Sequence, residues 1–93
     1  MTPVDISPRA EAELLEIAGR LAEFGPQAAL AFVDTFSSVI DQLRDFPELG
    51  QASRRIPHQR VLRRGVYRFV YEFRDGTVLL LGILDGRGQR ELP

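Results

Sequence analysis

The sequence contains no cysteine, no lysine and only one histidine, and these absences remove whole classes of protein. Without cysteine the chain has neither a disulfide scaffold nor a thiolate metal site, which fits a cytoplasmic protein. The single histidine, His58, has no second imidazole with which to bind a metal and no thiol to activate. We therefore predict no metal site and no cofactor.

Long apolar runs are also missing. The longest run, from Val78 to Leu84, is far too short to cross a bilayer, so no membrane association is expected. The first residues, MTPVDIS, lack the basic segment and apolar stretch of a signal peptide. Because 93 residues suffice to bury a modest core, we expect one domain over residues 1–93, located in the cytoplasm.

Charge is distributed unevenly, although the net charge is only −1. Residues 1–50 contain nine acidic residues and three arginines, whereas residues 51–93 contain nine arginines and four acidic residues. This asymmetry predicts an acidic face and a basic face, and the basic face suits an anionic partner. All 12 cations are arginines. Either the coding sequence is GC-rich, or the protein needs the bidentate contacts that arginine makes better than lysine.

Helix signals fill the first half of the chain, after a short strand predicted at residues 3–7. Ser7 is a plausible N-cap with proline at the first helical position, and Gly25-Pro26 separates this helix from a second. The expected helices, about residues 8–24 and 26–46, are joined so closely that they must form an antiparallel hairpin. Their apolar positions recur at helical spacing and should form the core: Leu14, Ile17, Leu21, Phe32, Phe36 and Leu43.

The second half changes to the period of β-strands. The dipeptide Asp75-Gly76 is a strong signal for a two-residue hairpin turn. It lies between the last two of three strands that we predict after a loop at residues 51–58: 59–64, 66–74 and 77–84. The element order is therefore β-α-α-β-β-β, in a single small α+β domain. Its helical hairpin should pack on one face of a twisted antiparallel sheet.

The register of the last hairpin follows if Asp75-Gly76 is the turn. Arg68 then faces Ile83 and lies diagonal to Asp85, within reach of an arginine side chain. Its charge is satisfied by Asp85 or Glu72, by a functional partner, or by both. The other face of the hairpin should pack on the helices because it is almost wholly apolar: Tyr67, Phe69, Tyr71, Phe73, Val78, Leu80, Gly82 and Leu84.

The face of the hairpin that carries Arg68 is unusually apolar for a lone domain. Exposed apolar patches tend to mark partner sites. Alternatively, the first strand or the C-terminal tail folds over this patch. Its apolar residues are Val66, Val70, Leu79, Leu81 and Ile83.

Several segments together resemble the RelE/ParE superfamily, the toxin half of bacterial type II toxin–antitoxin pairs. FPELG follows the helical hairpin, and YRFVY and ILDGRGQ come later. The last two are similar to the family's Y-R-[apolar]-V-Y strand and to its final strand, which ends in H-G-x-R-[DE]. The resemblance covers nearly the whole chain. The long helical hairpin followed by P-x-x-G is more similar to the ParE branch.

The resemblance implies a function and partners. Members of the ParE branch inhibit gyrase and have no known enzymatic chemistry. We therefore expect a toxin of the plasmid stabilization type that arrests growth by binding DNA gyrase. A small cognate antitoxin with a DNA-binding N-terminal half should neutralise it, and we expect no direct sequence-specific binding of nucleic acid. Target binding is assigned to Arg68, Asp85, Arg87 and Arg90. Antitoxin binding is assigned to the apolar residues of the exposed patch, Val66, Val70, Leu79, Leu81 and Ile83.

The RelE branch implies different chemistry, the ribosome-dependent cleavage of mRNA. That activity needs basic residues on the second and third strands and after the last strand, which Arg60, Arg68 and Arg87 match. Against it, no tyrosine follows Tyr71, and Asp85 stands where the family often has histidine. Arginines alone can stabilise the charge that develops during cleavage. This alternative therefore stays open, as does a non-toxic antitoxin-binding module.

Overall fold

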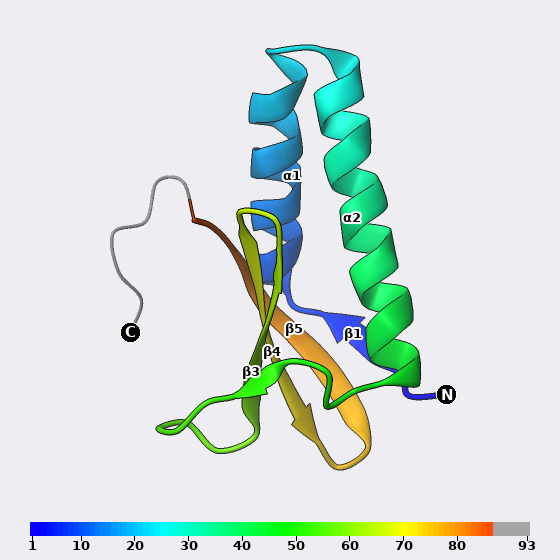
Figure 1. Cartoon of the computed structure of the whole chain (residues 1–93), viewed down its shortest axis with the longest axis vertical. Helices are drawn as coiled ribbons and strands as arrows, with labels where there is room; N and C mark the ends of the chain where they lie inside the picture. Colours follow the sequence, from blue (N-terminus) through cyan, green and yellow to red (C-terminus); the bar gives the residue numbers. More distant parts are fainter. Residues whose placement is uncertain (87–93) are drawn as a thin grey trace.

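A computed structural model describes residues 1–86, in which a helical hairpin stands on one face of a twisted sheet (Figure 1). The predicted α+β domain with the order β-α-α-β-β-β is confirmed, with one additional short strand. Among these residues, no helix is long and apolar enough to span a membrane. The elements are β1 (Val4–Ile6), α1 (Pro8–Ala22), α2 (Pro26–Asp45), β2 (Gln51–Ala52), β3 (Gln59–Arg64), β4 (Tyr67–Arg74) and β5 (Thr77–Asp85).

Local signals define the helical hairpin as predicted. The Ser7 hydroxyl accepts a hydrogen bond from the Ala10 N–H at 3.0 Å and so caps α1, whose first position is Pro8. Gly25 adopts a φ of 146°, which side chains disfavour, and α2 begins at the next residue, Pro26. The two helices therefore run antiparallel, as Figure 1 shows.

The strand order is β1-β5-β4-β3-β2. The sheet is mixed where an antiparallel one was expected, because β1 runs parallel to β5, with Val4 beside Val78. A three-residue strand carries no sequence signal for the direction of its partner. β2, which lies within the predicted loop, pairs with β3 through only Gln51 and Ala52.

The turn between β4 and β5 is the predicted two-residue turn. Asp75 and Gly76 have φ values of 53° and 75°, and both are positive as a type I′ turn requires. Next to the turn the pairing is also as expected, with Tyr71 beside Leu80.

Further along the same hairpin the register shifts by one residue, between Val70 and Tyr71. Arg68 consequently faces Leu84, and the predicted pairing with Ile83 is wrong. Such a bulge places one extra residue on one strand and exchanges the faces of the residues beyond it. Ile83 is therefore in the core, with 3% of its surface exposed, and it does not belong to the exposed apolar patch predicted on the face of Arg68.

The core lies between the helical hairpin and the sheet. Phe36 of α2 packs near Phe69 of β4, with 6.4 Å between ring centroids, and Phe32 lies 4.8 Å from Tyr67. The prediction that this face of β4 packs on the helices is confirmed. The buried residues are Ala10, Ile17, Phe32, Phe36, Val39, Ile40, Leu43, Leu62, Phe69, Tyr71, Val78, Leu80 and Ile83.

Candidate functional site on the open face of the sheet

We call the face of the sheet that turns away from the helices the open face. On β3 and β4 its side chains come from positions that alternate with the buried Leu62, Phe69 and Tyr71. They form three cross-strand rows: Arg63 beside Arg68, Val61 beside Val70, and Gln59 beside Glu72. On β5, Leu84 faces Arg68, and Leu79 faces Glu72. The open face is therefore basic at one end and apolar in the middle, and at the other end it carries Glu72 followed by the exposed Arg74.

Arg68 lies at the basic end. Its Nε atom is buried and has no hydrogen-bond partner among residues 1–86. Within residues 1–86, Arg68 forms no salt bridge with Asp85 or Glu72, the two partners that the sequence suggested. A buried donor without an acceptor is costly. Arg68 therefore needs an acceptor that the described part of the chain does not supply.

Arg63 is a feature of this site that sequence reasoning missed. It stands directly opposite Arg68 across the β3–β4 pair and is exposed. Like charges in such a pair repel, which destabilises the sheet. The signal was present, because Arg63 and Arg68 are symmetrical about the Gly65-Val66 turn. The predicted strands, 59–64 and 66–74, leave no room for a two-residue turn at that point.

Arg60 does not join Arg68. It pairs with the buried Tyr71, so it lies on the helix side of the sheet. Its guanidinium donates to the carbonyl oxygens of Glu48 (3.1 Å) and Gly50 (2.8 Å) and forms a 3.7 Å ion pair with Glu48. Arg60 thus holds the turn after α2, and the two arginines lie on opposite faces. Arg87, the third residue of the predicted cleavage set, lies outside the described residues.

Asp85 also lies on the helix side. It pairs with Tyr67, whose ring contacts Phe32 of α2, and it borders a cavity lined by Glu16 and Arg20 of α1. The expected diagonal approach of Asp85 to Arg68 is therefore wrong, because the bulge moved Asp85 to the other face. Of the remaining target-binding assignments, Arg90 lies outside the described residues.

The apolar residues assigned to antitoxin binding divide into groups. Val70 and Leu79 lie half-buried on the open face, and Leu81 is half-buried at the bulge. Val66 is exposed in the β3–β4 turn, with 42% of its surface accessible. Ile83 is buried, as described above.

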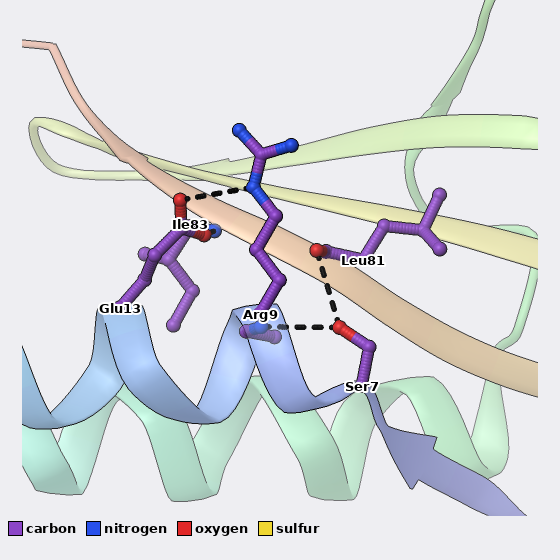
Figure 2. A network of polar contacts seen from close by, with 6 residues as sticks. Ser7, Arg9, Glu13, Leu81 and Ile83 are labelled. Carbon is purple, nitrogen blue, oxygen red and sulfur yellow. Dashed lines mark hydrogen bonds and ion pairs between the residues drawn. The ribbon is translucent and has the colours of Figure 1, made fainter.

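The N-terminal turn of α1 holds the bulge in place (Figure 2). The Ser7 hydroxyl donates to the Leu81 carbonyl oxygen at 3.2 Å, and the Glu13 carboxylate accepts from the Ile83 N–H at 2.8 Å. Glu13 also forms a 3.4 Å ion pair with the exposed Arg9. These contacts satisfy the Leu81 carbonyl and the Ile83 N–H of β5, which lie beyond the part of β5 that pairs with β1. No sequence signal pointed to them, since they join residues about 70 positions apart.

Tyr71 anchors the turn between α2 and β2 from inside the core. Its hydroxyl donates to the Pro47 carbonyl oxygen at 2.8 Å and accepts from the Gly50 N–H at 2.8 Å. Burial raises the pKa of this hydroxyl, and the bond from Gly50 and the charge of Arg60 lower it in part. Tyr71 therefore has a structural role and does not reach the open face.

The open face combines charged and apolar side chains, and its described residues form no bonded pair of an acid and a base. The exposed His58 lies in the loop before β3 with a φ of 67°, and its imidazole forms no hydrogen bond or ion pair among the described residues. No carboxylate in this part of the chain bonds to Arg63 or Arg68. What the face offers is a pair of positive charges beside an apolar surface.

The same arrangement of helices and strands occurs in solved toxin–antitoxin structures. A chain of the "Chromosomal ParDE TA system from P. aeruginosa" matches with a TM-score of 0.72 and 21% identity, covering 89% of this chain and 94% of that one. A chain of the toxin–antitoxin complex RelBE2 from Mycobacterium tuberculosis matches with a TM-score of 0.65 and 21% identity, covering 88% and 94%. The three chains therefore share one class of fold.

The sequence itself identifies the family within that class. The family described as "ParE toxin of type II toxin-antitoxin system, parDE" matches residues 4–90. The chain belongs to this ParE toxin family. No curated protein matches it.

Proposed function

We propose that this protein arrests bacterial growth by binding DNA gyrase and that a cognate antitoxin neutralises it. The observation that carries the proposal is the separation of Arg60 from Arg68. The cleavage set that the RelE resemblance implies requires Arg60 and Arg68 to converge on one phosphate. Here Arg60 is bound to the carbonyl oxygens of Glu48 and Gly50 on the helix side, while Arg68 is on the open face.

The composition of the open face also supports binding to a protein. Val61 and Val70 lie beside each other in its centre, and Glu72 occupies the end opposite Arg68. A phosphate backbone would meet an apolar centre and a like charge there, whereas phosphate contacts dominate the affinity of nucleic-acid-binding proteins. A protein partner can match all three zones.

The antitoxin is the expected partner because the two matched structures are a ParDE system and a RelBE2 complex. We expect a small protein with a DNA-binding N-terminal half, encoded by an adjacent reading frame. A segment that folds on binding can wrap a surface of this kind. Co-expression of the two should restore growth and yield a complex that survives purification.

Two assays on the same induced culture test the proposed activity. Purified gyrase should lose its supercoiling of plasmid DNA when this protein is added, and mRNA 5′ ends on translating ribosomes should not change. Arg68→Ala should weaken the inhibition, whereas Arg20→Ala, which removes an exposed arginine from α1, should not. Unimpaired supercoiling in an arrested culture contradicts the gyrase proposal.

The second candidate is ribosome-dependent cleavage of mRNA, which the position of Arg68 on β4, the third strand of the predicted order, favours. Codon-phased 5′ ends that disappear on Arg68→Ala, with supercoiling untouched, would identify this activity. Normal growth with no effect in either assay would identify a non-toxic antitoxin-binding module.

A further inference from the structure

The basic end of the open face has the features of an anion-binding site. Among the described residues, Arg68 Nε is buried without an acceptor. Arg63 stands directly across from it, and side chains in such a pair have Cβ atoms about 4.5–5.5 Å apart. One anion between the two guanidinium groups would supply the missing acceptor and cancel their repulsion. Two arginines with these planar donors suit a carboxylate or a phosphate.

A cavity at this point leaves room for the anion. Its volume is about 230 Å³. The backbone is closely packed on one side, since a Cβ atom at Gly86 would lie 2.7 Å from the Val66 carbonyl oxygen and 3.7 Å from Arg68 Nη1. The residues that line the cavity are Arg63, Gly65, Val66, Tyr67, Arg68 and Gly86.

The neighbouring rows indicate what the anion is attached to. The apolar pair Val61 and Val70 lies two residues along the strands from the arginine pair, and Gln59 with Glu72 lies two residues beyond. A ligand that fills the arginine site must therefore continue over an apolar surface toward a negative charge. A peptide can do this with alternating side chains, whereas a phosphate backbone would approach Glu72 unfavourably.

We propose that Arg63 and Arg68 together bind the carboxylate of one acidic side chain of the antitoxin. The next antitoxin residue on the same side is apolar and covers Val61 and Val70. It follows two positions away in a strand or four positions away in a helix, because both spacings span about 6–7 Å. The carboxylate site rests on the proposed function, since that function supplies the antitoxin. The carboxylate site adds that the antitoxin neutralises the protein by covering Arg68 directly.

The affinity of the full-length protein for the purified product of the adjacent reading frame, measured by titration calorimetry, tests the site. Arg63→Ala and Arg68→Ala should each weaken binding by roughly tenfold or more, as expected for a charge-assisted pair. The double variant should lose much less than the product of the two effects, because both arginines hold one group. Arg44→Ala, which removes an arginine at the end of α2 that pairs with Asp41, serves as the matched control and should bind unchanged.

Substitutions on the antitoxin complete the test. Replacing each of its acidic residues by the corresponding amide should reveal one position at which Arg63→Ala no longer has an effect. Thermal unfolding of each variant checks that the fold is intact.

Unchanged affinity of folded Arg63→Ala and Arg68→Ala overturns the carboxylate site but leaves the proposed function standing. Failure of the unmodified chain to bind the antitoxin instead contradicts the proposed function. If Arg63→Ala and Arg68→Ala leave the antitoxin affinity unchanged but abolish mRNA cleavage, the carboxylate site is overturned in favour of a site for an RNA phosphate.

Discussion

Glu13 accepts a hydrogen bond from the backbone of Ile83 at 2.8 Å, and this contact joins the first helix to the last strand across a separation of 70 residues. It lies immediately after the β4–β5 bulge (Figure 2). In the unbulged register Ile83 would face the open side and Asp85 would lie on the face of Arg68. The position of Glu13 therefore helps to decide which side chains the open face presents.

Replacing Glu13 should loosen this end of β5. Glu13→Ala leaves the Ile83 N–H without its acceptor and should lower the free energy of unfolding by about 1–3 kcal/mol. Glu13→Gln keeps an acceptor oxygen and should lose less. Urea unfolding measures the stability, and hydrogen exchange of the Ile83 amide locates the change. Glu16→Ala, on the same helix, is the control, and an equal loss there would contradict the role of Glu13.

The core prediction compares two phenylalanines that differ in burial. Phe36 is 8% exposed and Phe24 is 87% exposed. Phe36→Ala should cost about 3–5 kcal/mol, because it removes a packed ring and leaves a cavity. Phe24→Ala, at the tip of the helical hairpin, should change stability by no more than about 0.5 kcal/mol. Denaturant unfolding of both variants measures the difference, and similar losses of stability would contradict the position of the core described here.

Two glycines should respond to alanine in opposite directions. A Cβ atom at Gly50 would lie 2.8 Å from Tyr71 Cε1 and 2.9 Å from the Val61 carbonyl oxygen, whereas nothing lies within 4 Å of one at Gly19. Gly50→Ala should therefore destabilise the protein by about 1–3 kcal/mol through overpacking. Gly19→Ala should stabilise it by about 0.5–1 kcal/mol, because it lies inside α1. Melting temperatures that shift in the same direction would contradict this assignment.

Tyr71 makes stability depend on alkaline pH. Burial raises the pKa of its hydroxyl above the ordinary 10.0. A raised pKa means that folding favours the protonated form, so this contribution is complete below pH 10.0 and is lost as the pH rises through the folded-state value. Tyr71→Phe should be less stable at neutral pH by about 1–3 kcal/mol, because the Gly50 N–H loses its acceptor.

The gap between wild type and Tyr71→Phe should close above pH 10.0. Thermal unfolding between neutral and strongly alkaline pH measures it for both proteins. A gap that stays constant with pH would show that the Tyr71 hydroxyl does not titrate as described.

The helices and the turn at Asp75 were predictable because their signals are local. Caps, helix-starting prolines and a two-residue turn depend on neighbours in the sequence. The bulge was not predictable, because the residues from Leu79 to Leu84 are apolar with one glycine, so alternation gives no mark of register. An all-apolar strand can shift by one residue without changing its pattern.

The candidate site was predictable only in part for the same reason. Arg68 was correctly placed on the open face, because the apolar residues around it fix the buried side of β4. The role of Arg60 depends on the carbonyl oxygens of Glu48 and Gly50, which only the folded turn brings near it. The opposition of Arg63 and Arg68 depended on placing the β3–β4 turn.

The parallel pairing of β1 with β5 has a consequence for the time at which the protein matures. Val4 leaves the ribosome before its strand partner, Val78, has been made. Contacts of such long sequence separation form slowly and only when both strands are present. The sheet therefore closes only after β5 has left the ribosome, and until then β1 lacks the strand with which it pairs.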